Sequence, residues 1–199
     1  MEIGCGFALR IASASTGFKL HSHHINYGTG SGQQVVSTIN EMNDPGSLWV
    51  IKEPFGERPC TTGKRVACGQ RIRLEHLTSG RNLHSDKEFQ SPLGNKQEVS
   101  VFGFNGNGDI SDDWIIECAD DGQDFLKGST IFYLRHAETE DYLYTDNQFT
   151  YTQENCRNCP IIGQREVSAA ERRDKFCEWQ IVGVNSNKSI IFYREFSIP

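Results

Sequence analysis

Apolar and polar residues alternate over short stretches along almost the whole chain. Clear examples are Phe7 to Ile11, Arg71 to His76, Val99 to Val101, Ile131 to Tyr133 and Trp179 to Ile181. Such stretches are bounded by Gly, Asn or Asp residues, and this pattern is typical of strands with one buried face. The best helix candidate, residues 169–176, is short and highly charged and fits a single turn. The pattern therefore predicts an all-β fold.

The alternating pattern also recurs three times along the chain. Three sets of residues mark the recurrence: Trp49, Trp114 and Trp179; Leu20, Leu83 and Leu143; Val35, Val99 and Val167. The tryptophans are spaced 65 residues apart each time. A period that spans most of the chain indicates a repeat architecture, and three repeats of about 60 residues are too few and too long for most solenoids. We therefore expect closure about a threefold axis, which leaves no open sheet edge.

We interpret residues 1–199 as a single domain with repeats at approximately 4–60, 66–120 and 126–184. Each repeat offers about four short strands, or about twelve in total, lengths and numbers that suit one closed sheet. Residues 185–199 form a tail that contains an apolar stretch from Ile190 to Phe192. We expect this tail to supply a closing strand that pairs with the N-terminal strand.

Composition and charge narrow the class of partner. The 199 residues are 37% hydrophobic, enough for one sizeable core, and no apolar run approaches the roughly 18 residues of a membrane-spanning helix. The formal net charge is -6 and the isoelectric point is near 5.5. An acidic chain without a basic cluster argues against nucleic acid, polyanions or an acidic membrane surface as the main partner.

The cysteines predict an oxidising compartment. Cys5 and Cys68 directly precede a repeat glycine, and Cys60 and Cys118 lie late in the same repeats, so we pair Cys5 with Cys60 and Cys68 with Cys118. The three cysteines of the third repeat cannot be paired from the sequence; they are Cys156, Cys159 and Cys177. A structural bridge within Cys156-x-x-Cys159 is favoured over a redox pair, because no helix start is present to lower a thiol pKa.

Three features of the sequence bear on residence in the secretory pathway. Asn187 lies in an Asn-x-Ser glycosylation sequence, which weakly supports residence in that pathway. The first residues show no signal peptide, so the disulfide prediction implies that a signal has been removed. The chain ends in Ser-Ile-Pro without a retention signal, and retention in the endoplasmic reticulum would therefore need a partner.

Four segments resemble stromal-cell-derived-factor-2-like proteins, which consist of three MIR repeats. These segments are residues 20–36 (LHSHHINYGTGSGQQVV), 68–85 (CGQRIRLEHLTSGRNLHS), 91–103 (SPLGNKQEVSVFG) and 112–118 (DDW-x-x-x-C). The resemblance covers about residues 4–118 closely. It is weaker in the third repeat, where Tyr144-Thr145 replaces His-Ser and the Cys156-Arg-Asn-Cys159 sequence has no counterpart.

The resemblance implies a fold, a compartment and partners. It implies a β-trefoil of three four-stranded MIR repeats with pseudo-threefold symmetry, in the lumen of the endoplasmic reticulum. It also implies association with a lumenal J-domain co-chaperone and a heat-shock chaperone. Related MIR repeats occur in protein O-mannosyltransferases and in inositol trisphosphate and ryanodine receptors, which favours a binding module over any particular ligand.

Histidines and polar loops supply the candidate ligand contacts. His21-Ser22-His23-His24 is the densest histidine cluster, and His21 recurs as His84, so a histidine that defines the repeat and is hydrogen-bonded within a loop is the favoured interpretation. Ligand contact by these loops is the alternative. The residues that would bind a glycan or a protein are His21, His23, Tyr27, Gln33, Arg81 and His84. No metal is expected, because zinc needs four suitable ligands and no fourth is nearby.

Other motifs are incomplete. The Gly28 to Gly32 stretch lacks the Lys-Ser/Thr of a phosphate-binding loop, and we interpret it as a flexible loop that leads into Gln33. The alternating oxygen side chains after Asn105 resemble a calcium loop, but Ile116 stands where the bidentate Glu would be, so a tight turn is favoured. No nucleophile with a base and an orienting partner is evident. We therefore expect no cofactor and no enzyme activity.

Two functions from different classes remain. The first is a non-enzymatic, monomeric accessory factor of a chaperone and J-domain co-chaperone complex in protein folding quality control. The second is a carbohydrate-binding module for mannose-type glycans or O-mannosylated proteins. An exposed apolar patch would favour the first, and a concave polar pocket lined by the His-Ser loops would favour the second. We expect the three tryptophans to be buried; the alternative is exposed platforms for sugar stacking.

Overall fold

A computed structural model describes residues 1–185 and 190–192 of the chain, and its architecture is all-β with three one-turn 3-10 helices. Its elements are β1 (Ala8–Ser13), β2 (Lys19–Asn26), β3 (Gln34–Ile39), η1 (Pro45–Ser47), β4 (Trp49–Lys52), β5 (Arg71–His76), β6 (Arg81–Gln90), β7 (Gln97–Phe102), η2 (Ile110–Asp112), β8 (Trp114–Cys118), β9 (Phe132–His136), β10 (Tyr142–Tyr144), β11 (Arg165–Glu166), β12 (Ser168–Ala170), η3 (Lys175–Cys177), β13 (Trp179–Asn185) and β14 (Ile190–Phe192). The predicted all-β class is confirmed, and no helix among the described residues has the length and apolarity to cross a membrane.

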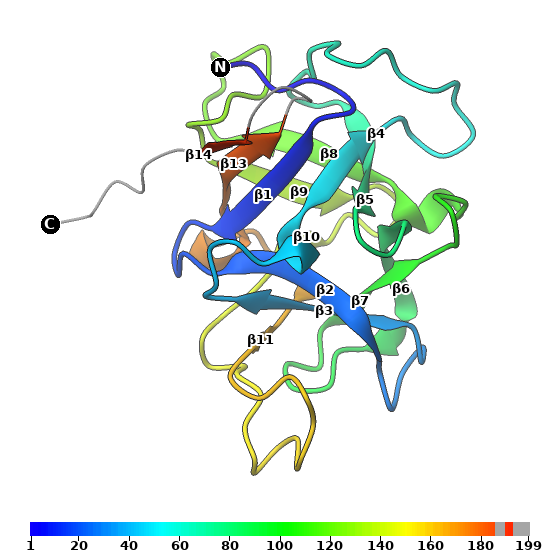
Figure 1. Cartoon of the computed structure of the whole chain (residues 1–199), viewed down its shortest axis with the longest axis vertical. Coiled ribbons are helices and arrows are strands. Elements are labelled where there is room, and N and C mark those ends of the chain that lie inside the picture. The colour runs from blue at the N-terminus through cyan, green and yellow to red at the C-terminus, as the bar shows by residue number, and fades with distance from the viewer. Residues whose placement is uncertain (186–189, 193–199) are drawn as a thin grey trace, which may run out of the picture.

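Six strands pair in a closed ring. Going round the ring, β1 pairs with β4, β4 with β5, β5 with β8, β8 with β9, β9 with β13 and β13 again with β1, all antiparallel. Each repeat contributes its first and last strand to this ring, which occupies the upper part of the molecule in Figure 1. Closure of the ring leaves none of these six strands with an open edge.

Six of the remaining eight strands form three hairpin-like pairs at one end of the ring. These pairs are β2 with β3, β6 with β7, and β10 with β12. The third strands of the repeats also contact one another: β3 pairs with β7, β7 pairs with β12, and β11 pairs with β3. Figure 1 shows β2, β3 and β7 below the ring, with the loop that leads into β11 projecting furthest from it.

The opposite end of the ring is closed by its own set of backbone hydrogen bonds. The amide of Ile3 donates to the carbonyl of Leu126, the amide of Leu126 donates to Val66, and the amide of Val66 donates to Ile3. All three side chains are buried in the main core. Three equivalent residues, each preceding the first strand of its repeat, thus satisfy one another in a circle.

The three tryptophans lie at the centre of the core, as predicted, and are 0% exposed. Each indole Nε1 donates to the carbonyl of the repeat leucine, at 2.9 Å for Trp49, 3.0 Å for Trp114 and 3.0 Å for Trp179. Buried indoles need such a partner for their one polar atom. Because the rings are inaccessible, the alternative of exposed sugar-stacking platforms is wrong.

The structure corrects one predicted equivalence among the valines of the repeats. The buried valines at equivalent positions are Val36, Val99 and Val167, whereas Val35 packs in a separate cluster with Tyr27. Hydrogen bonds fix the equivalence: Ser22 Oγ donates to the carbonyl just before Val36, and Ser85 Oγ and Thr145 Oγ1 donate to the carbonyls just before the other two valines. Two adjacent valines in the first repeat made the sequence ambiguous by one residue, and such a shift moves a side chain to the opposite face.

The disulfides agree with the prediction where one was made. Cys5 is bonded to Cys60, and Cys68 to Cys118. In the third repeat Cys156 is bonded to Cys159, and Cys177 is a buried free thiol. Three disulfides in a chain of this size indicate that it folds in an oxidising compartment.

The C-terminal segment differs from the prediction. Strand β14 pairs with β13, which lies between it and β1, so pairing of this segment with the N-terminal strand is wrong for the residues described. The strand total also exceeds the expected twelve, because β14 is additional and the third strand of the last repeat is divided into β11 and β12. Asn187, the predicted glycosylation site, lies outside the described residues.

Candidate functional site

An aspartate caps the 3-10 helix of every repeat. The carboxylate of Asp44 accepts a hydrogen bond from the amide of Gly46 at 2.7 Å, and Asp109 and Asp174 do the same in the other repeats, at 3.0 and 2.8 Å. Capping satisfies amides that the helix itself leaves unpaired. Sequence reasoning missed this set, although a signal existed: an Asp stands five residues before each tryptophan.

His21 lies against the cap of the first repeat and is 4% exposed. Its Nδ1 lies 3.4 Å from Ser47 Oγ and 3.4 Å from the carboxylate of Asp44, and its Nε2 is 2.8 Å from Nδ1 of His23. Burial lowers the pKa of His21 to about 4, against the opposing effect of the Asp44 charge. The ring is therefore neutral at pH 7 and is held by neighbours within its own repeat.

His84 occupies the equivalent place in the second repeat. Its Nδ1 is 2.9 Å from Asp112, and Asp112 also accepts hydrogen bonds from the amide of Asp109 and from Asn82 Nδ2, each at 3.0 Å. Ligand atoms of His84, Asp109 and Asp112 lie within 4.8 Å of one another, which is close enough for a metal ion. The capping box of η2 and the contact with His84 already use these atoms in the protein's own hydrogen bonds.

The other predicted ligand residues do not gather around a shared cavity. Tyr27 is buried, with its hydroxyl donating to the carbonyl of Val99 at 2.9 Å, so it has no surface to offer a ligand. The side chain of Gln33 accepts a hydrogen bond from Ser100. Arg81 is half-buried and lies opposite His76 across β5 and β6. None of the six lines any of the cavities described below.

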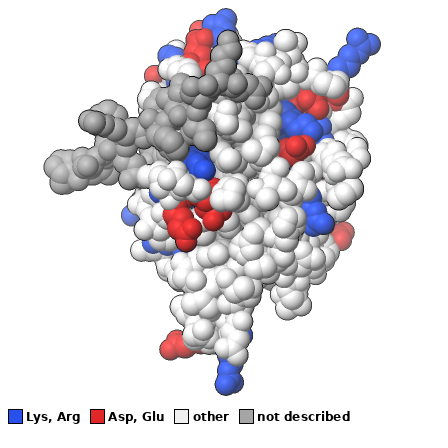
Figure 2. Space-filling model, in the orientation of Figure 1, with Lys and Arg blue, Asp and Glu red and all other residues white. Residues whose placement is uncertain are grey.

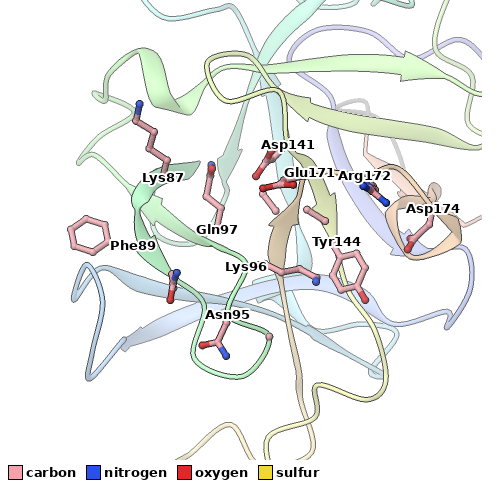
Figure 3. Close-up of a pocket in the computed structure, with 14 residues that line it drawn as sticks. Lys87, Phe89, Asn95, Lys96, Gln97, Asp141, Tyr144, Glu171, Arg172 and Asp174 are labelled. Atoms are coloured by element: carbon pink, nitrogen blue, oxygen red, sulfur yellow. The ribbon is translucent and has the colours of Figure 1, made fainter.

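A groove lies between the second and third repeats on the described surface. It consists of two adjoining cavities of about 610 and 510 Å3, whose linings share Lys87, Gln97, Asp141 and Glu171. One wall is the hairpin of β6 and β7, and the other is formed by β10, β12 and the turns beside them. Figure 3 shows the Asp141 and Glu171 carboxylates close together above Lys96, with Lys87 and Phe89 on the opposite wall. We call this the inter-repeat groove.

Small residues in β12 line the inter-repeat groove. Ala170 lies opposite Tyr142, and the equivalent positions in the first two repeats hold Ile39 and Phe102. The third-to-first junction is also filled, because the Arg165 guanidinium lies 3.5 Å from the centre of the Phe18 ring. The third repeat therefore has a smaller side chain at the Ala170 position of the groove wall than the first two repeats have at theirs.

The inter-repeat groove carries charges of both signs. Lys96 Nζ lies 4.9 Å from the centre of the Tyr144 ring, a cation-π contact, and Arg172 is exposed nearby. Burial raises the pKa of Asp141, and the negative charge of Glu171 raises it further. Neither of these two carboxylates forms an ion pair or side-chain hydrogen bond with any residue that the structure describes. Sequence reasoning missed the groove because its walls come from different repeats.

We expect the buried histidines to make stability depend on pH. Burial lowers the pKa of His21 and of His76 to about 4, from an ordinary value of 6.5. The folded protein therefore binds fewer protons than the unfolded chain between these values, and folding stability falls as the pH drops from 6.5 toward 4. Urea midpoints measured from pH 7.5 to 4.5 check this, and the His76→Gln variant should show a shallower decline. A midpoint that stays constant from pH 7.5 to 5 contradicts it.

The described surface outside the inter-repeat groove has no single large apolar patch. The exposed large apolar side chains of the described residues lie on separate segments: Met1, Met42, Phe55, Leu77, Phe104, Ile110 and Ile162. On the face shown in Figure 2, charged side chains of both signs are scattered among neutral ones. The described surface therefore suits polar recognition better than the capture of unfolded, apolar segments.

Comparisons with known proteins agree on one relationship. The model of the MIR domain family matches residues 15–176. A stromal cell-derived factor 2-like protein of Dictyostelium discoideum is 39% identical over 182 residues, which are 90% of this chain and 81% of that protein. The crystal structure of the SDF2-like protein from Arabidopsis thaliana is 30% identical, with a TM-score of 0.83 and coverage of 97% of this chain and 98% of that chain.

A larger protein contains a similar unit. The protein O-mannosyltransferase Pmt1-Pmt2 complex of S. cerevisiae, solved with its sugar donor bound, matches with a TM-score of 0.81 and 27% identity. The match covers 98% of this chain but 28% of that chain. The similar part is thus a minor portion of that transferase.

Proposed function

Because the chain belongs to the stromal cell-derived factor 2 family of MIR-domain proteins, we propose that it is a non-enzymatic binding protein of the endoplasmic reticulum lumen. It acts there as an accessory factor of a chaperone and J-domain co-chaperone complex in protein folding quality control. The three disulfides support an oxidising compartment such as this lumen.

The fold proposed with this function is a β-trefoil of three four-stranded MIR repeats, monomeric and with pseudo-threefold symmetry. The closed ring of six strands supports it, as does the mutual pairing of β3, β7, β11 and β12 at one end. The circle of hydrogen bonds among Ile3, Val66 and Leu126 supports it at the other end. A rigid scaffold of this kind presents its loops and hairpins for binding.

The inter-repeat groove carries the binding function, and membership of the stromal cell-derived factor 2 family carries the choice of a protein partner over a glycan. The groove is polar, it bears unpaired charges of both signs, and it lies between rigid hairpins. A concave site with a few well-placed polar groups is the usual form of a recognition site. In the smaller cavity Thr139 Oγ1 lies 2.9 Å from Nδ1 of His136, but His136 is 0% exposed and its Nε2 is hydrogen-bonded to the carbonyl of Ser111, so binding is the activity that we infer for the groove.

A carbohydrate-binding function is the second candidate, and a specific observation favours it. The smaller cavity of the groove is lined by Ser85, which follows His84 in strand β6, and by Gln97. Phe89 and Tyr144 add aromatic rings to the larger cavity. The similar unit in a protein O-mannosyltransferase points in the same direction. The glycans concerned would be of the mannose type, free or carried by O-mannosylated proteins.

Affinity capture separates the two functions. The protein is immobilised and incubated with a native lumenal extract, and the capture is repeated with excess free mannose and mixed glycans. We expect recovery of a J-domain protein and a heat-shock chaperone that sugar does not reduce. Loss of these partners on addition of sugar would instead establish the carbohydrate-binding function. Recovery of neither protein in any sample contradicts the accessory-factor proposal.

A further inference from the structure

Two carboxylates that have no cationic partner lie together in the inter-repeat groove. Asp141 and Glu171 line both of its cavities, and neither has a cationic partner among the described residues. Asp141 is half-buried and Glu171 is exposed, whereas two other half-buried acids are each paired with a cation: Glu75 with Lys52 at 2.7 Å and Glu117 with Arg135 at 2.6 Å. The charge of the pair is therefore left available at the point where the two cavities meet.

The lysines that line the same groove form no ion pair with Asp141 or Glu171. Lys96 lies over the rings of Tyr144 and Phe149, 4.9 and 5.9 Å from their centres. Lys87 is exposed on the β6 hairpin, and Figure 3 shows it on the opposite wall from the carboxylates. Because like charges close together at a partly desolvated site repel, an incoming cation relieves the repulsion and forms charge-assisted hydrogen bonds.

The shape of the groove selects among cationic ligands. Both carboxylates line both cavities, so a ligand that extends through the two cavities passes beside the pair. The walls offer the side-chain amides of Gln90 and Asn95, the amide oxygen of Gln97, whose Nε2 already donates to Ser85 and Thr139, and the ammonium groups of the lysines. These groups suit the alternating donors and acceptors of a peptide backbone. Neither carboxylate belongs to a cluster of potential metal ligands among the described residues, which disfavours a bare cation.

We propose that an extended polypeptide segment binds along the inter-repeat groove, with one lysine or arginine side chain held by Asp141 and Glu171. The proposal deepens the accessory-factor function above and rests on it for the choice of a protein ligand. The segment would come from a partner protein and would need a polar backbone path rather than apolar anchors, because the groove has few apolar side chains.

The test uses three fluorescein-labelled peptides with blocked ends. Each is nine residues of glycine, serine and asparagine, with lysine, norleucine or glutamate at the centre. Binding to the full chain is measured by fluorescence anisotropy at low ionic strength. We expect the lysine peptide to bind about tenfold more tightly than the norleucine peptide, which corresponds to one charge-assisted contact, and the glutamate peptide to bind least.

Matched variants assign the preference to the pair. Asp141→Asn and Glu171→Gln together should abolish the tenfold preference for lysine, while Glu154→Gln, which removes an exposed acid from a distant loop, should leave it unchanged. Unaltered urea midpoints show that the variants are folded. Equal binding of the lysine and norleucine peptides, a preference that survives in the double variant, or no binding at millimolar peptide each overturns the proposal.

Two further outcomes keep this inference separate from the function on which it rests. If the peptides fail but the double variant still captures a J-domain protein from lumenal extract, the peptide site is wrong and the accessory function stands. If a mannose oligosaccharide binds instead and the double variant loses that binding, the groove is a glycan site and the peptide proposal is overturned.

Discussion

The Trp114→Ala variant should lose about 3 to 5 kcal/mol of unfolding free energy, the usual cost of truncating a fully buried aromatic residue. The indole is 0% exposed, and its Nε1 donates to the carbonyl of Leu83 at 3.0 Å. Truncation opens a cavity in the centre of the core and leaves that carbonyl without its buried donor. Urea unfolding followed by far-ultraviolet circular dichroism measures the loss without relying on tryptophan fluorescence.

The other two tryptophans serve as replicates for this experiment, and an exposed phenylalanine serves as its control. Trp49→Ala and Trp179→Ala should have effects of similar size, because both indoles are also 0% exposed and make the same hydrogen bond. Phe104→Ala removes an aromatic ring that is 68% exposed and should change the unfolding free energy by less than about 0.5 kcal/mol. A loss at Trp114 no larger than that at Phe104 would contradict the central place of the tryptophans.

Replacing Cys68 and Cys118 together by serine should lower the unfolding free energy by about 4 kcal/mol, on the chain-entropy model for a loop of this length. The bond joins residues separated by 50 positions and ties the start of β5 to the end of β8. Its absence leaves the unfolded chain many more conformations, which favours unfolding. The measurement is urea unfolding of the oxidised double variant and of the oxidised wild-type protein.

The short disulfide of the third repeat is the matched control. Cys156 and Cys159 are separated by three positions, so the same model gives about half the effect when both are replaced by serine. Equal losses in the two double variants would show that loop length does not set the contribution of these bonds. A negligible loss at Cys68 and Cys118 would show that the second repeat holds together without its bridge.

The groove shows how far sequence reasoning reached for the site. The histidines stand out because His21 and His84 recur, yet both are used in hydrogen bonds within their own repeats. The lining of the inter-repeat groove comes from residues 85–97 and 111–174, which have no local motif in common. Gln97 and Asp141 became neighbours of one cavity because β7 pairs with β12. Only a three-dimensional arrangement could show that.

The sequence by itself determined the strand class, the burial of the tryptophans and two of the disulfides, and it predicted three repeats. These features depend on local alternation and on recurrence at a regular spacing, both of which are written along one dimension. The tertiary structure decided the order in which strands pair around the ring, including the pairing of β14 with β13. It also decided that Val36 rather than Val35 enters the main core, because the face of a strand depends on its partner's register. The groove belongs to the same class, because its lining, which includes Ala169 and Ala170, comes from segments that are distant in sequence.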